Sequence, residues 1–100
     1  MIYLTQLIYI QEGQEEIFDE FESIAIPIIR NYNGELVLRI RPDKEALIEG
    51  TIELPYEIHL VLFQTQEDYE NFTDDEERKR FLHLKEESIR ETILIHGEVV

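Results

Sequence analysis

The sequence contains no cysteine and no tryptophan, and only three prolines and four glycines in 100 residues. Without cysteine the chain forms no disulfide framework, no thiolate metal site and no cysteine nucleophile, so a reduced, cytoplasmic compartment is expected. No apolar run approaches the roughly 20 residues that a membrane-spanning helix needs. The apolar N-terminus also lacks the basic region and cleavage site of a signal peptide.

Basic residues are scarce as well. Nine lysines and arginines stand against 23 acidic residues, which gives a formal net charge of -14. Binding of a polyanion or an anionic membrane needs a basic surface, so we expect neither a nucleic acid nor a membrane as partner. Small anions stay open, because screening over about 10 Å lets two neighbouring arginines outweigh distant acidic groups.

What the chain does have is enough apolar sequence for one packed domain. Hydrophobic residues make up 43% of it, which is more than a disordered acidic segment carries. One hundred residues suffice for one hydrophobic core, and we find neither an internal repeat nor a linker. We therefore expect a single domain over residues 1–100.

Hydrophobic periodicity divides this domain into strands and helices. Alternation with a period of two predicts strands over residues 2–10, 35–41, 56–64 and 92–100. Helical spacing begins at Gln14, with Pro27 late in the pattern, where we expect a kink or a tightened last turn. Asn33-Gly34 follows and is suited to the positive φ that ends a helix.

The second half of the chain carries two capping-box sequences. Thr65 and Thr73 each precede an acidic residue by three positions, which predicts a short helix after Thr65 and a longer one after Thr73. Residues 42–55 are polar, with two breakers, and are interpreted as a loop with a helical turn at Lys44–Ile48.

The resulting order is β-α-β-β-α-β, which predicts an α+β, ferredoxin-like domain with a four-stranded antiparallel sheet. We expect the first and third strands at its centre, parallel to each other, and both helical regions on one face. The more aliphatic row of each strand is expected to face the helices. These rows are Ile2/Leu4/Ile8, Leu36/Leu38/Ile40, Ile58/Leu60/Leu62 and Ile93/Ile95.

The opposite rows carry nearly all the chemically capable strand residues, and we expect them on the face away from the helices. They are Tyr3/Thr5/Leu7/Tyr9, Val37/Arg39/Arg41, His59/Val61/Phe63 and Thr92/Leu94/His96. Helices on one side leave the large apolar groups of the other face uncovered, over more than the few hundred Å² that a monomer tolerates. This predicts a homodimer packed sheet to sheet.

Several short motifs resemble those of the dimeric α+β barrel superfamily, and in particular of one uncharacterised bacterial family within it. They are Ile26-Pro27, Tyr32-Asn33-Gly34, Leu38-Arg39, Glu49-Gly50, Leu62-Phe63 and Ile95-His96-Gly97. Glu35 and the charged segment 73–80 depart from that family's pattern. The resemblance implies a dimer with packed sheet faces and no particular activity, because the superfamily spreads many functions over one fold.

Arginine and histidine supply the candidate chemistry. Arg39 and Arg41 are spaced to share a strand face, where they would clamp a carboxylate or phosphate, or else form ion pairs with the acidic surface or the partner subunit. His59 lies in the most apolar strand, where a neutral imidazole would act as a base or would only satisfy a buried hydrogen bond.

Other catalytic arrangements are missing. His83 and His96 have no partner at zinc-ligand spacing, so no metal is expected. Ser23 and Ser88 lie in no nucleophile motif, and no glycine loop suits a phosphate-containing cofactor. The superfamily that the sequence resembles includes haem-degrading enzymes, and this chain has no tryptophan or asparagine at the positions where those enzymes carry theirs. We therefore expect no cofactor.

Three hypotheses for function follow. The first is a cytoplasmic homodimer that binds a small organic ligand, anionic if the arginines take part. Its cavity would be lined by Tyr3, Tyr9, Arg39, Arg41, His59 and His96. The second is a cofactor-free monooxygenase-like or isomerase-like enzyme, with His59 as base and Arg39 holding the substrate carboxylate. The third is a structural or interaction module without a ligand. A cavity beside Arg39 or His59 separates the first two from the third.

Overall fold

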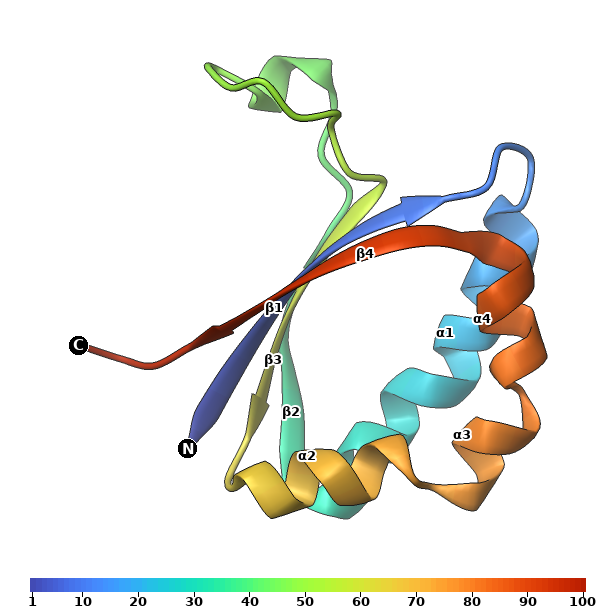
Figure 1. Cartoon of the computed structure of the whole chain (residues 1–100), viewed down its shortest axis with the longest axis vertical. Helices are drawn as coiled ribbons and strands as arrows, with labels where there is room; N and C mark the ends of the chain where they lie inside the picture. Colours follow the sequence, from blue (N-terminus) through green and yellow to red (C-terminus); the bar gives the residue numbers. More distant parts are fainter.

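The computed structural model describes residues Met1 to Val100 as one four-stranded sheet with helices beside it (Figure 1). The first half contains strand β1 (Ile2–Ile10), helix α1 (Glu15–Ile29), a 3-10 turn (Arg30–Tyr32) and strand β2 (Gly34–Ile40). A second 3-10 turn (Lys44–Ala46) precedes strand β3 (Glu57–Phe63). Helices α2 (Gln66–Thr73), α3 (Glu76–Arg80) and α4 (Leu82–Ser88) then lead to strand β4 (Ile89–Gly97).

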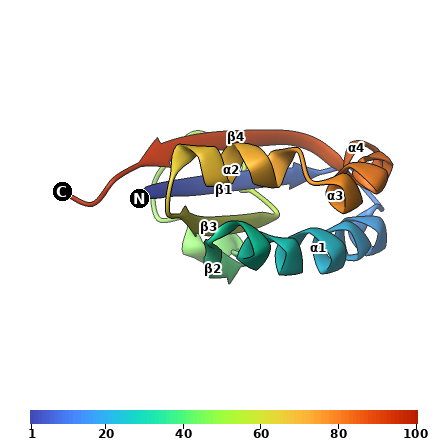
Figure 2. The same cartoon turned by 90° about the horizontal axis from the view of Figure 1, so that it is seen from below.

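The sheet has the order β2-β3-β1-β4, with every neighbouring pair antiparallel. All four helices lie on one side of it (Figure 2). This confirms the predicted α+β, ferredoxin-like class and the central position of β1 and β3. The prediction that β1 and β3 run parallel is wrong, because the α1 crossover makes β2 parallel to β1 and the β2–β3 connection then reverses the chain.

Helix α1 begins and ends as its sequence predicts. Glu15 and Glu16 lie in its first turn, where the positive end of the helix dipole favours acids. Pro27 is accommodated near the end, and the chain tightens there into the 3-10 turn. Asn33 then adopts a left-handed conformation with φ 57°. Gly34 is needed for close packing, because a Cβ there would lie 2.6 Å from Ile29 Cγ2.

The second helical arm is more divided than predicted. The Thr65 hydroxyl caps α2, accepting a hydrogen bond from the Asp68 amide at 3.0 Å. Thr73 does not start the next helix. Its hydroxyl donates to the Glu70 carbonyl within α2, and Asp75 is the cap of α3, because its carboxylate accepts a hydrogen bond from the Arg78 amide at 2.9 Å. None of the helices is long and apolar enough to cross a membrane.

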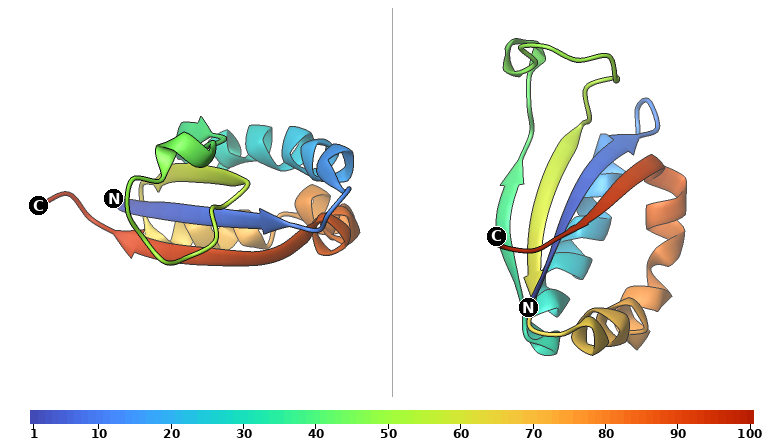
Figure 3. Two further views of the ribbon diagram at one scale, coloured as in Figure 1. Left: turned by 90° about the horizontal axis from the view of Figure 1, so that it is seen from above. Right: turned by 60° about the vertical axis from the view of Figure 1, so that its left-hand side comes forward.

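The core contains two apolar clusters. One packs the covered side of the sheet against α1 and combines Leu4, Ile29, Val61 and Phe63, and the other joins α1 to α4 through Phe21, Ala25 and Leu84. Phe63 is completely buried, and burying a side chain of this size contributes about 1.5–3 kcal/mol. The connection between β2 and β3 instead projects beyond the sheet (Figure 3), and Ile48 on it is 96% exposed.

Strand register shows which residues share a face, and it corrects three of the four strand orientations. On β1 the predicted row faces the helices. On β3 and β4 the opposite row does, because His59 pairs beside Gln6, and His96 pairs beside the buried Leu4. The helix-facing side therefore contains Leu4, Gln6, Ile8, Glu57, His59, Val61, Phe63, Thr92, Leu94 and His96.

Strand β2 changes face within its own length. Leu36 faces the helices as predicted, but the register shifts between Leu36 and Leu38. Such a bulge inserts one residue and reverses the alternation after it. Leu38 and Ile40 consequently lie on the bare face beside Leu60 and Ile58, and Arg39 lies on the covered side beside His59. The prediction that both arginines face away from the helices is therefore wrong.

Candidate functional site

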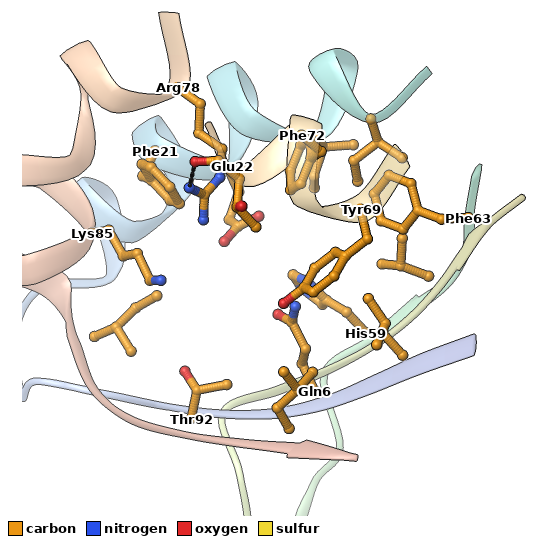
Figure 4. A pocket seen from close by; sticks show the side chains of 17 residues that line it. Gln6, Phe21, Glu22, His59, Phe63, Tyr69, Phe72, Arg78, Lys85 and Thr92 are labelled. Carbon is orange, nitrogen blue, oxygen red and sulfur yellow. Dashed lines mark hydrogen bonds between the residues drawn. The ribbon is translucent and has the colours of Figure 1, made fainter. Parts of the chain in front are cut away.

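A cavity of about 230 Å³ lies between the sheet and the helices, on the covered side (Figure 4). Three of the four strands and all four helices contribute to its walls or its rim. The walls are mainly apolar and include Leu4, Phe21, Ile26, Ile29, Val61, Phe63, Phe72, Ile89 and Leu94. Mainly apolar walls with a few convergent polar groups are typical of small-molecule sites.

Those polar groups come from different elements. They are Gln6 on β1, Glu22 on α1, His59 on β3, Tyr69 and Thr73 on α2, Arg78 on α3, Lys85 on α4 and Thr92 on β4. Their convergence depends on the tertiary fold, since nearly 90 residues separate the first from the last. One acid, two bases and one imidazole thus face a single small volume.

Glu22 is the acid of this cavity. It is only 7% exposed, although its charge suggests the outer face of α1. It lies on the buried stripe because it follows Phe18 by four residues and precedes Ala25 by three. Burial raises the pKa of Glu22 to about 7, against the opposing effect of Arg39, Lys85 and Arg78. No protein hydrogen bond contributes to that pKa.

Arg78 and Lys85 are the two cations of the cavity. Burial is the main reason that the pKa of each lies below its ordinary value. Arg78 Nη1 donates to the Thr73 carbonyl at 3.2 Å, the dashed line in Figure 4. Neither residue forms a salt bridge with an acid of the chain, and the Lys85 ammonium projects toward the cavity. Both therefore keep capacity for an anionic partner.

His59 lies on the cavity wall, and Glu57 on the same strand fixes the orientation of its ring by a hydrogen bond. Its Nε2 is 2.8 Å from Glu57 Oε1. Burial holds the pKa of His59 below its usual value although the hydrogen bond to Glu57 acts to raise it. Because Glu57 is ionised, a neutral His59 carries its proton on Nε2, and Nδ1 is left as an acceptor.

Glu57 also binds both arginines that the sequence singled out. Arg39 Nε donates to Oε1 at 2.7 Å, and Arg41 Nε donates to Oε2 at 3.2 Å. Burial alone would raise the pKa of Glu57, but hydrogen bonds from Arg39, His59 and Arg41 together lower it. The arginines form ion pairs, as the second of the two predicted roles has it, but their main partner is the buried Glu57, and only Asp19 belongs to the acidic surface.

The remaining candidates lie apart from the cavity. Tyr3 is on the bare face, paired with Leu62. The Tyr9 hydroxyl donates to the Glu53 carbonyl at 2.8 Å. Tyr9 and Arg41 line a second, more open recess of about 440 Å³. His96 is on the covered side, where its ring meets Tyr69 edge to face at 6.2 Å. Of the six candidates, only His59 lines the first cavity.

The sequence reasoning missed Glu22, Arg78 and Lys85. Glu22 carried a usable signal, since an acid at helical spacing among Phe18, Ala25 and Ile29 lies on the buried stripe. Arg78 and Lys85 had no such signal, because the break at Phe81 between α3 and α4 decides which way they face.

No protein-family model and no curated protein matches the sequence. Solved structures do. A Rhodopseudomonas palustris protein of unknown function has 11% identity and a TM-score of 0.84, over 99% of this chain and 82% of its own. An uncharacterised NIPSNAP domain protein from Burkholderia xenovorans has 14% identity and a TM-score of 0.74, over 100% and 95%.

A DABB family protein from Mesorhizobium loti, described as having a ferredoxin-like fold, has 14% identity and a TM-score of 0.68, over 99% of this chain and 96% of its own. Identities this low establish the fold alone. The chain therefore has the ferredoxin-like α+β fold of these proteins, as the resemblance of its sequence implied.

Proposed function

We propose that this protein binds a small organic anion in the cavity between sheet and helices. The observation that carries the proposal is the pair of cations, Arg78 and Lys85, which line an apolar cavity without a salt bridge to any acid of the chain. A partly buried cation without an anion loses hydration and gains no ion pair in return. A ligand carboxylate would supply that ion pair.

The aromatic side of the cavity suggests the other half of the ligand. The Phe63 ring lies 5.6 Å from Tyr69 and 5.4 Å from Phe72, centroid to centroid. These rings form an apolar wall that suits a flat or aliphatic body. At about 230 Å³, the cavity is smaller than the roughly 300–1,000 Å³ of drug-sized sites. The ligand class is therefore a small carboxylate with one apolar group.

Thermal-shift titration with phenylacetate, and with phenylacetamide as the uncharged analogue, tests this proposal. We expect the carboxylate to raise the melting temperature and the amide to have little effect. A charged hydrogen bond contributes about 1.5–3 kcal/mol, so Lys85→Met is expected to weaken carboxylate binding about ten-fold to a hundred-fold. Lys79→Met is the matched control, because Lys79 is exposed and pairs with Asp74. Equal binding of acid and amide, or equal loss in both variants, would contradict the proposal.

The second part of the proposal is a homodimer formed through the bare face of the sheet. Rows of aliphatic residues cross this face, including Leu38, Leu60 and Ile95, with Leu38 43% and Ile95 50% exposed. A second row contains Ile40, Ile58, Leu7 and Ile93. No helix lies over them, and a contiguous apolar surface is typical of a protein interface.

Light scattering at micromolar concentration tests the dimer. We expect a dimeric mass for the wild type and a monomeric mass for Leu60→Asp, because a charge on the central strand would be buried in the interface. Asn71→Asp, on the exposed side of α2, adds the same charge away from the sheet and should leave the mass unchanged. A stable wild-type monomer would contradict this part of the proposal.

A cofactor-free enzyme is the second candidate function. It is favoured by His59, which lines the cavity and whose ring is oriented by its hydrogen bond to Glu57. This arrangement suits a general base. Arg39 is not available to hold the substrate carboxylate of such an enzyme, because it forms an ion pair with Glu57. Arg78 and Lys85 take that role in the proposal.

A further inference from the structure

Two titratable side chains face the cavity from opposite layers of the fold. Glu22 enters from α1, and His59 enters from β3 (Figure 4). No hydrogen bond from the protein contributes to the pKa of the Glu22 carboxyl group. The His59 ring forms a hydrogen bond through Nε2 alone, with Glu57. Each therefore has a proton-transfer position that the protein does not occupy.

Their protonation states differ in a useful way. Burial raises the pKa of Glu22 to about 7 and lowers that of His59. The charged groups that act on Glu22 are Arg39, Arg78 and Lys85, which oppose the rise, and Glu57, which supports it. Near neutral pH a large share of Glu22 is a protonated acid while His59 is a neutral base. General acid–base catalysis needs both of these forms at once.

We infer that Glu22 and His59 form an acid–base pair that tautomerises an enolisable carbonyl acid bound between them. This inference rests on the proposed binding of a small organic anion. It identifies the substrate class as a 2-oxo acid, whose carboxylate is held by Arg78 and Lys85 and whose carbonyl faces Glu22. The aromatic wall receives the substituent on the reacting carbon.

The chemical step is redox-neutral. His59 Nδ1 removes a proton from the carbon next to the carbonyl, and the electron pair of the broken C–H bond forms the C=C bond. The carbonyl π electrons move to oxygen, which takes the proton from the Glu22 carboxyl group. His59 has then gained one proton and Glu22 has lost one, and exchange with water restores both.

The proposed role of Glu22 is proton transfer, which is distinct from the recognition of the ligand charge by Arg78 and Lys85. A merely structural Glu22 would influence folding and leave the proton transfer of the bound acid unaffected. A catalytic Glu22 sets the rate at which a carbon-bound proton exchanges. The two roles are separable with a substrate whose exchange is visible without turnover to a new product.

Phenylpyruvate in D₂O supplies that readout, because proton NMR follows the loss of its C3 protons. We expect the wild-type protein to accelerate the exchange over buffer. Acid–base groups contribute about 10²–10⁴-fold, so Glu22→Gln and His59→Gln should each slow the protein-dependent exchange about 100-fold or more. Glu20→Gln is the matched control, since Glu20 is exposed on the same helix.

The pH profile provides the second readout. The rate should rise as His59 loses its proton, below its ordinary pKa of 6.5, and should fall as Glu22 ionises near pH 7. Glu22→Gln should retain the acidic limb and lose the alkaline one. Circular dichroism on each variant confirms that the fold is kept, and calorimetric titration measures phenylpyruvate affinity in parallel.

The outcomes separate this inference from the proposed function. Phenylpyruvate binding without accelerated exchange overturns the acid–base pair and leaves anion binding intact. Accelerated exchange that Glu22→Gln does not slow also overturns it. Failure of phenylpyruvate to bind overturns the substrate class, and failure of phenylacetate as well overturns the proposed function.

Discussion

Two buried glutamates on the covered side of the sheet have opposite electrostatics. Glu57 is 1% exposed and Glu22 is 7% exposed, so burial alone disfavours the charge of both. The pKa of Glu57 is nevertheless lowered, and that of Glu22 is raised to about 7. The difference lies in their partners, since three side chains donate to Glu57 and Glu22 has charged groups only at longer range.

The comparison distinguishes two uses of buried charge. Around Glu57, hydrogen bonds from Arg39, Arg41 and His59 replace the water lost on burial, and this cluster stabilises the sheet. Around Glu22, the corresponding space is the cavity. Glu22 receives no hydrogen bond there, and Arg78 and Lys85 form no salt bridge, so their burial is costly unless a ligand binds among them. The first cluster is therefore structural, and the second is the one at which we propose that a ligand binds.

The largest expected effect comes from removing the charge of Glu57. Glu57→Gln leaves two arginines without their carboxylate, and breaking such a buried pair costs about 3–5 kcal/mol. Arg39 and Arg41 are partly exposed and regain some hydration, so we expect a loss of about 3 kcal/mol in urea unfolding at pH 7. Glu35→Gln on exposed β2 is the control.

The same measurement has a pH signature. The folded-state pKa of Glu57 lies below 4.5, so its contribution is present above pH 4.5 and is lost as the pH falls through that folded-state value. The difference between wild type and Glu57→Gln should shrink in acid. A loss under about 1 kcal/mol at pH 7 would make Glu57 equivalent to a surface ion pair and would remove the contrast with Glu22.

Glu22→Gln should change stability in the opposite direction. Its folded-state pKa of about 7 lies above the ordinary 4.5, so the folded protein binds more protons between these values. The unfolding free energy of the wild type relative to the variant therefore falls as the pH rises through this window. The pKa shift corresponds to about 3 kcal/mol. Burial of the glutamine amide in the variant offsets part of the stability that it gains from losing the charge.

We accordingly expect the free energy of unfolding of Glu22→Gln to exceed that of the wild type by about 2 kcal/mol at pH 8.5 and to equal it near pH 4.5. Denaturant unfolding at several pH values provides the difference curve. Glu20→Gln should show no comparable pH dependence. A wild type that is the more stable of the two at pH 8.5 would mean that Glu22 has satisfied partners, like Glu57.

The smallest effect is expected at the outer end of the arginine cluster. Asp19 lies 3.5 Å from Arg39 and 3.4 Å from Arg41, but half of its side chain is exposed. Ion pairs of this kind contribute about 0–1 kcal/mol, so Asp19→Asn should alter urea unfolding by no more than about 0.5 kcal/mol. A larger loss would extend the structural cluster from Glu57 to the surface.

Local sequence determined the order of the elements and most of their ends. Alternation of apolar residues on β1 and β3, helical spacing on α1, Asn33-Gly34 and Thr65 all act over a few residues, and the places of the strands and helices predicted from them are confirmed. The break between α3 and α4 and the early start of β4 were not predicted, and α3 is capped by Asp75 where the sequence pointed to Thr73.

Only the tertiary structure decided which face of each strand meets the helices. A period of two defines two faces without ranking them, and the more aliphatic rows of β3 and β4 lie on the bare side. The register shift before Leu38 then turned Arg39 toward Glu57. The pKa of Glu22 likewise depends on burial and on charges from four other elements. Such through-space effects have no counterpart in local sequence, because they arise only when distant segments pack together.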